Sequence, residues 1–297
     1  MTEYRFDCVL RSDADVGEGP AWNVEDQCLY WVDIHKCNVN RFDPATGVNR
    51  TWDLPSEPGC LVFRDGGGAI IPARDGVYDF DFSTGEMNRI LAPPYDPTIY
   101  RFNDGKCDRQ GRLWVGTMPL DLKDLGTFPG ALYRYDGTTL EARLQIEMSN
   151  GTAFSPDGRT MYRAETRQRI IYAYDFDPVA GALSREREFT RIPPGTGAPD
   201  GATVDTEGGY WVAVAAGPNG GAIARYTPDG KLDLRIETPV PAPAMVNFGG
   251  PDMSTLYVTS SRFDFLADRP GQELSGSIFT VDTGFTGVPE PRFKGVG

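Results

Sequence analysis

The stretch "LYWVDIHKCNVNRFDPATG" (residues 29–47) contains the unit from which the fold can be predicted. A β-rich run is followed by a short connection, a second β-rich run and a polar turn that ends in glycine. Five later stretches follow the same plan: "AIIPARDGVYDFDFSTG" (69–85), "LWVGTM…GALYRYDG" (113–137), "MYRAETRQRIIYAYDFDPVAG" (161–181), "YWVAVAAGPNGGAIARYTPDG" (210–230) and "LYVTSSR…GSIFTVDTG" (256–284). The plan therefore occurs six times along the chain.

The spacing of these repeats favours a closed ring of small sheets. Their starts are roughly 40 to 50 residues apart, which leaves room for four short strands in each unit. Six antiparallel units that cannot bury both faces alone predict an all-β fold, a six-bladed β-propeller, and we expect residues 1–297 to form one such domain. A linear solenoid and a pair of β-sandwiches are the alternatives, but solenoid repeats are usually shorter and two sandwiches do not explain six recurrences.

Composition agrees with many short strands and excludes several partners. The 297 residues include 35 Gly and 24 Pro, with 13 Tyr and 16 Phe, and 40% of the residues are apolar. The net charge of −13 argues against binding to nucleic acid or to an anionic membrane surface, because both need clustered Lys and Arg.

Nothing in the sequence indicates export or membrane insertion. The N-terminus, "MTEYRFDCVLRSDADVGEG", lacks an apolar signal core, and no later stretch approaches 18 apolar residues. Five cysteines, an odd number without a C-x-x-C pair, are read as free thiols of a reducing compartment. We therefore expect a cytoplasmic protein.

Polar residues recur ten to twelve positions before the strand that follows each turn. The position holds Glu18, Asn103, Asn150 and Asp200 in the first, third, fourth and fifth repeats, and apolar or turn-forming residues in the other two. In a propeller, equivalent positions lie at equivalent depth around the central channel, so these side chains should converge there. Carboxylate and amide oxygens are ligands of hard divalent cations, although Asn and Asp before Gly also cap turns.

Other chemistries find little support in the sequence. His35 is the single histidine, so a Ser-His-Asp triad or a His/Cys zinc site cannot easily be built, and no G-x-S-x-G motif occurs. No phosphate-binding glycine motif follows a strand. The tryptophans Trp22, Trp31, Trp114 and Trp211 are expected to pack between blades.

At these polar positions the chain resembles the gluconolactonase/regucalcin (senescence marker protein) family. The resemblance covers nearly the whole chain and rests on motifs in the family's order: "GEGPAW", "RFNDGKCDRQGRLWVGTM", "SNGTAFSPDGRTMY", "PDGATVDTEGGYWVA" and "FGGPDMSTLYVTS". It implies a six-bladed propeller with one divalent metal in the central channel and hydrolysis of sugar lactones to aldonic acids.

The resemblance also implies roles for individual residues. Glu18, Asn150 and Asp200 match the metal ligands, and Arg101 and Asn103 match substrate-binding residues. Asp121 stands where the family often has Glu, and "YRAETR" (162–167) stands where it commonly has an Asp-Ser pair, so both departures bear on substrate identity.

A mechanism follows from the chemistry of lactone hydrolysis. A cation held by Glu18, Asn150 and Asp200 polarises the lactone and activates water, and Asp200 serves as general base. Arg101 and Asn103 hold the sugar and stabilise negative charge, and Asp121 accepts hydrogen bonds from sugar hydroxyls. Ca²⁺, Mg²⁺, Mn²⁺, Zn²⁺ and Fe²⁺ all remain candidate cations. The alternatives are an organophosphate-type hydrolase and a non-catalytic propeller that binds a metal or a partner.

Overall fold

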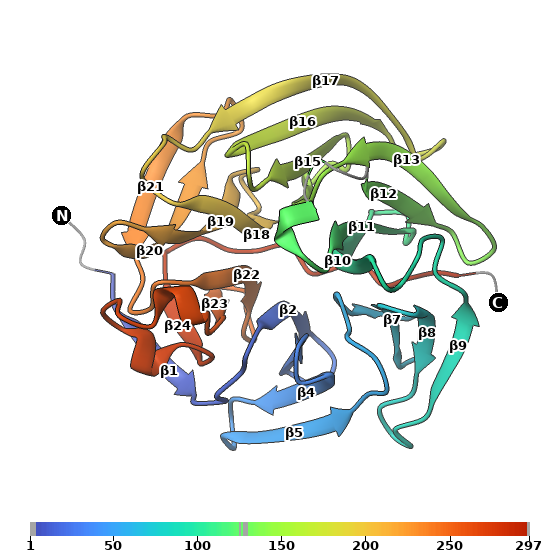
Figure 1. Cartoon of the computed structure of the whole chain (residues 1–297), viewed down its shortest axis with the longest axis horizontal. Helices are drawn as coiled ribbons and strands as arrows, with labels where there is room; N and C mark the ends of the chain where they lie inside the picture. The colour runs from blue at the N-terminus through green and yellow to red at the C-terminus, as the bar shows by residue number, and fades with distance from the viewer. Residues whose placement is uncertain (1–3, 125, 127–129, 296–297) are drawn as a thin grey trace.

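The computed structural model describes residues 4–124, 126 and 130–295. Its strands form six four-stranded antiparallel sheets, which are arranged as blades around a central axis (Figure 1). The prediction of a six-bladed β-propeller is therefore confirmed.

Each blade has an innermost strand beside the axis and three further strands toward the rim. The innermost strands are β2 (Gly17–Asn23), β6 (Val62–Phe63), β10 (Tyr100–Cys107), β14 (Ser149–Phe154), β18 (Ala198–Val204) and β22 (Pro243–Gly249). The second strands are β3 (Cys28–Asp33), β7 (Ala69–Ala73), β11 (Leu113–Pro119), β15 (Thr160–Glu165), β19 (Tyr210–Gly217) and β23 (Thr255–Ser260). The third strands are β4 (Asn38–Asp43), β8 (Gly76–Phe80), β12 (Gly130–Tyr135), β16 (Ile170–Asp177), β20 (Gly220–Tyr226) and β24 (Ile278–Asp282). The outer strands are β5 (Val48–Asp53), β9 (Met87–Leu91), β13 (Leu140–Ile146), β17 (Ala182–Arg191), β21 (Leu232–Glu237) and β1 (Phe6–Leu10).

The two ends of the chain close the ring. The N-terminal strand β1 pairs with β24, so the first strand in sequence completes the last blade (Figure 1). The segment after β24 then runs across the molecule. Its Gly287 forms an isolated β-bridge with Asp205, and its Phe293 forms one with Arg64. On the way, Glu290 pairs with Lys106 of β10 at 2.5 Å, so the C-terminal segment lies against the innermost strands.

Large aromatic side chains fill the spaces between blades. Trp31, Trp114 and Trp211 occupy the second strands of alternate blades and are at most 2% exposed, and Trp22 is 3% exposed. The expectation that these tryptophans pack between blades is confirmed.

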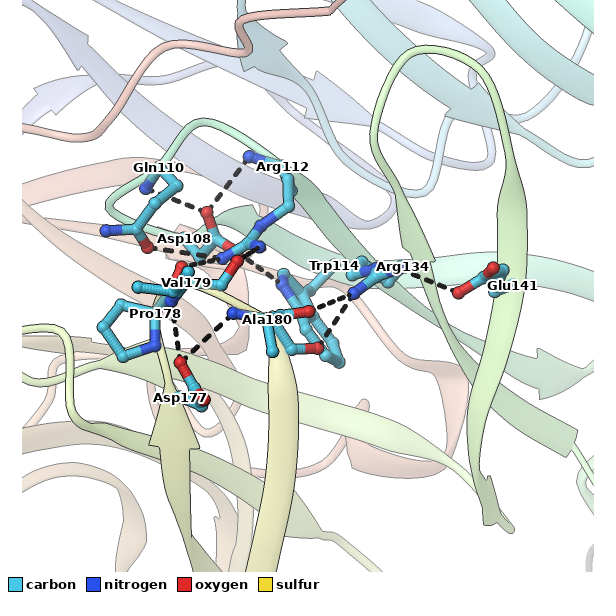
Figure 2. Close-up of polar contacts among 11 residues, drawn as sticks. Asp108, Gln110, Arg112, Trp114, Arg134, Glu141, Asp177, Pro178, Val179 and Ala180 are labelled. Carbon is cyan, nitrogen blue, oxygen red and sulfur yellow. Dashed lines mark hydrogen bonds and ion pairs between the residues drawn. The ribbon is translucent and has the colours of Figure 1, made fainter.

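A polar contact joins the third and fourth blades near the turn between β16 and β17 (Figure 2). Arg112 donates to Asp108 Oδ2 at 2.7 Å and to the carbonyl of Pro178 at 2.7 Å. Arg134 donates to the carbonyls of Ala180 and Gly181 at 2.9 and 3.0 Å. Two arginines of the third blade thus bind the carbonyls of a turn in the fourth.

A one-residue irregularity interrupts the pairing of every innermost strand. The register shifts between Glu18 and Ala21, Phe102 and Gly105, Asn150 and Ala153, Pro199 and Ala202, and Pro243 and Val246. The second blade shows the same shift. Pro58 bridges Ala73 and Val62 pairs with Ile70, so the inner strand has one more residue between these two pairs than its partner. Each shift is a β-bulge, a device that turns side chains away from the regular alternation of a strand. The polar residues singled out from the sequence lie in or beside these bulges.

The cysteines are free, and Cys28, Cys60 and Cys107 are buried. Among the described residues, no helix is long and apolar enough to cross a membrane.

Candidate metal centre and active site

The bulges place the predicted site residues at two adjacent positions and not at one. Glu18 and Asn150 are the last paired residues before the bulge of their strands. Asn103 and Asp200 come one residue later, inside the bulge. Because the strand alternation is suspended in a bulge, residues at neighbouring positions can face the same side.

Glycines permit this backbone. Gly19 and Gly151, which directly follow Glu18 and Asn150, have φ values of 55° and 59°, in the left-handed region that glycine adopts without strain. Gly201, after Asp200, lies against the neighbouring innermost strand, because a Cβ there would stand 2.3 Å from Met245 Cγ. In "GEG", "SNG" and "PDG", the final glycine is therefore needed for the backbone arrangement, and the polar residue before it is needed for the chemistry.

Hydrogen bonds join the third and fourth blades through Asn103. Arg101 Nη1 donates to Asn103 Oδ1 at 2.7 Å, and Asn103 Nδ2 donates to Asn150 Oδ1 at 2.7 Å and to the Ser149 carbonyl at 2.8 Å. Asn150 Nδ2 in turn donates to Thr166 Oγ1 at 2.8 Å. The orientation of the Asn150 amide is thus fixed, with one lone pair of Oδ1 still free for another partner.

The carboxylates of Glu18, in the first blade, and Asp200, in the fifth, lie close enough in the channel for their charges to interact. Burial raises the pKa of Glu18 well above its ordinary value, and the charges of Asp200 and Asp104 raise it further. Burial and the charge of Asp104 raise the pKa of Asp200 to about 7, while Arg101 opposes both shifts. Both side chains keep some surface open, so they lie deep in the channel and yet can be reached.

Asp104 is a further member of this cluster that the sequence analysis did not assign to the site. It is 5% exposed, its Oδ2 accepts a hydrogen bond from the Thr152 amide at 2.7 Å, and its Oδ1 is buried without a hydrogen-bond partner. Its pKa is raised to about 6, chiefly by burial. The signal for it was present in "RFND", where the residue directly follows Asn103.

Two other positions take no part in the cluster. Asp121 lies beyond the end of β11, and its carboxylate accepts from the Lys123 amide at 2.9 Å with its side chain 56% exposed. Its role in substrate binding stays a prediction. Glu165 of "YRAETR" is held by Arg163 Nη1 at 2.7 Å and by the Met148 amide at 3.1 Å, so its buried carboxylate stabilises the strand.

His35, the single histidine, lies in the exposed turn between β3 and β4. In the part of the chain that the structure describes, no three His, Cys, Asp or Glu side chains gather as a tight metal cluster. A His/Cys zinc site therefore has no candidate among these residues.

The residues of the channel fit a hard divalent cation. Glu18 and Asp200 offer carboxylate oxygens, Asn150 offers an amide oxygen, and all three come from separate innermost strands. The buried Asp104 Oδ1 without a partner indicates a surplus of negative charge that a cation would balance. Two carboxylates and an amide match the all-oxygen coordination of Ca²⁺, Mg²⁺ or Mn²⁺.

Comparison with known proteins gives a consistent result over the length of the chain. The chain is 39% identical to the 6-deoxy-6-sulfogluconolactonase of Pseudomonas putida, covering 97% of this chain and 98% of that protein. It is 35% identical to the pentonolactonase XacC of Haloferax volcanii, covering 96% of each.

The structural comparison agrees. The crystal structure of regucalcin from Agrobacterium tumefaciens, described as a calcium-binding protein, has a TM-score of 0.88 at 25% identity and covers 99% of this chain and 100% of that one. Residues 16–262 match the family described as SMP-30/Gluconolactonase/LRE-like region. The chain therefore belongs to the SMP-30/gluconolactonase family.

Proposed function

We propose that this protein hydrolyses a sugar lactone to the corresponding aldonic acid with the help of one divalent cation. The observation that carries the proposal is that Glu18 and Asp200 interact electrostatically with the buried Arg101, which Asn103 links by hydrogen bonds to Asn150. The relatives named as a sulfogluconolactonase and a pentonolactonase support the substrate class, and the calcium-binding regucalcin supports a cation.

Glu18, Asn150 and Asp200 would hold the cation through their side-chain oxygens. A divalent cation at such a site polarises a carbonyl and lowers the pKa of water. The residues themselves must orient the lactone, remove a proton from the attacking water and stabilise the oxyanion that forms when the water adds to the carbonyl carbon.

Asp200 is the general base in this proposal. In the metal-free protein, burial and the charge of Asp104 raise its pKa to about 7. A cation beside it lowers that pKa, so the carboxylate is ionised at neutral pH and can accept the proton of the attacking water. The proton is then available to the ring oxygen, which leaves as the hydroxyl of the product when the ring C–O bond breaks.

Arg101 is the group that stabilises developing negative charge. It is 7% exposed, and Asn103 holds one side of its guanidinium at 2.7 Å. A preoriented cationic donor in a buried site stabilises an oxyanion more than it would in water. Asn103 orients both Arg101 and Asn150, and this adds to its proposed contact with substrate.

The test is acid release in a weakly buffered indicator assay. Metal-stripped protein is mixed with pentono- and hexonolactones, including a 6-sulfo hexonolactone, and Ca²⁺, Mg²⁺, Mn²⁺, Zn²⁺ or Fe²⁺ is added singly. Metal-dependent turnover above the spontaneous rate, differing between sugars, is the expected result. Tight cation binding without turnover of any lactone would leave the non-catalytic propeller as the better account, and turnover of a phosphotriester alone would favour the organophosphate hydrolase.

We also propose that the protein works in the cytoplasm. Its five free cysteines support a reducing compartment.

A further inference from the structure

The carboxylate of Asp104 is a buried charge in the channel without an ion-pair partner of its own among the described residues. It is 5% exposed, and its only hydrogen bonds come from backbone amides, including that of Thr152 at 2.7 Å. Oδ1 is buried and has no hydrogen-bond partner. A buried carboxylate in this condition is costly unless a positive charge lies near it.

The other charges around the channel supply only part of that compensation, because Lys106 lowers the pKa of Asp104 while its partner Glu290 raises it. Lys106, two residues further along β10, is paired with Glu290 at 2.5 Å, and Arg74 is paired with Glu57 at 3.1 Å. Each of these pairs is neutral as a whole. Arg101 is the cation that acts on both Glu18 and Asp200.

The charges of the cluster therefore leave an excess of two negative charges. Three carboxylates, those of Glu18, Asp104 and Asp200, act on one another, and Arg101 offsets one of them. One divalent cation makes the cluster neutral, which is the condition that a buried set of charges requires. If Asp104 were uncharged, the same cation would leave the site with a net positive charge.

We propose that Asp104 is a positioning residue of the metal centre. It supplies the third negative charge that balances a divalent cation, and it holds the bulge that carries Asn150 through the Thr152 amide. Asp104 does not touch the cation, because its Oδ1 lies beneath the surface of the channel and its Oδ2 is occupied. This inference rests on the part of the proposed function that places a divalent cation in the channel. It does not depend on the hydrolysis of a lactone.

Two substitutions separate the charge of Asp104 from its hydrogen bond. Asp104→Asn removes the charge and can still accept from the Thr152 amide, whereas Asp104→Ala removes both. The matched control is the double variant Lys106→Met/Glu290→Gln, which removes an ion pair whose two charges act on Asp104 in opposite directions. A second neutral-pair control, Arg74→Met/Glu57→Gln, serves if the first does not fold.

The measurement is the dissociation constant of Ca²⁺ and of Mn²⁺ for the metal-stripped full chain, determined by calorimetry. Substitutions beside the ligands of metal sites typically cost 10–100-fold in affinity, and we expect Asp104→Asn to raise Kd by about that factor. Asp104→Ala should weaken binding by only a few-fold more, and the neutral-pair control should stay within about threefold of the wild type. With saturating metal, kcat of Asp104→Asn should recover to near the wild-type value.

If Asp104→Asn binds cations with wild-type affinity, the proposed role of the Asp104 charge is wrong. If Asp104→Ala then binds cations weakly, only the hydrogen bond to the Thr152 amide supports the metal centre. An equal loss in the neutral-pair control would also overturn it, because the effect would then be structural. The binding measurement needs no substrate. A wild-type protein that binds cations but hydrolyses no lactone would refute the proposed function and leave the role of Asp104 to be decided by Kd alone.

Discussion

Replacing Asp200 by asparagine should make the metal-free protein more stable at neutral pH while it weakens the metal centre. The reason is that the carboxylate is ionised at a buried position without its cation. The pKa of Asp200 is about 7, against an ordinary value of 3.8, because of burial and the charge of Asp104. At 1.36 kcal/mol per pH unit, ionising Asp200 in the folded metal-free protein costs about 4 kcal/mol.

The sign of the pH dependence follows from the direction of this shift. A carboxyl with a raised pKa binds its proton more tightly in the folded state, so its stabilising effect is complete below pH 4. That effect is lost as the pH rises toward 7. Between pH 5 and pH 8 the metal-free wild type should lose about 3 kcal/mol through Asp200 alone. The pKa of Glu18 is raised as well, partly by Asp200, so the substitution relieves Glu18 too.

The assay is urea unfolding in the presence of a chelator at pH 5 and pH 8, followed by tryptophan fluorescence. Asp200→Asn should flatten the pH dependence and exceed the wild type in unfolding free energy at pH 8. Asp268→Asn, at an exposed position, is the control and should behave as the wild type. If Asp200→Asn keeps the wild-type pH slope, the carboxylate does not lie in the buried, mutually repelling cluster described above.

Further predictions concern the hydrogen bonds and ion pairs that support the site and the ring. Asn103→Leu breaks the contacts between Arg101 and Asn150, and it should raise the Kd for divalent cations and lower kcat/KM by about 10–100-fold, measured by calorimetry and steady-state kinetics. Arg112→Ala leaves the fully buried Asp108 without its ion-pair partner and should cost about 3 kcal/mol in urea unfolding. Arg143→Ala breaks a more exposed pair with Glu141, and it should cost less than about 1 kcal/mol. Glu290→Gln leaves Lys106 buried without a carboxylate and should destabilise the protein by about 3 kcal/mol; an unchanged midpoint would show that the C-terminal segment contributes little.

The blade pattern was predictable because each repeated stretch forms two paired strands of one blade. The stretch at 29–47 contains β3 and β4 and the turn that follows, and the same relation holds around the ring. The polar turns, the tryptophans between blades and the free cysteines were also predictable, since each depends on local composition. That residues 1–297 form one domain stays a prediction.

The arrangement inside the channel was less accessible, because it depends on bulges that sequence spacing does not reveal. A constant offset suggested that Glu18, Asn103, Asn150 and Asp200 occupy one equivalent position, whereas the register puts them at two adjacent ones. The bonding of Asn103 to two neighbouring side chains could not be read from "RFND". The importance of Asp104 depends on its burial and on the pairing of Lys106 with Glu290, a residue 184 positions away along the chain.

The central claim is that Glu18, Asn150 and Asp200 together hold a divalent cation at the axis of the propeller. The most direct measurement is a crystal structure of the full chain soaked with Mn²⁺, with anomalous diffraction used to locate the metal. The account predicts one strong peak in the channel, about 2.0–2.6 Å from an oxygen of each of the three side chains. A peak at other residues, or a channel without a peak in crystals that bind Mn²⁺ elsewhere, would contradict it.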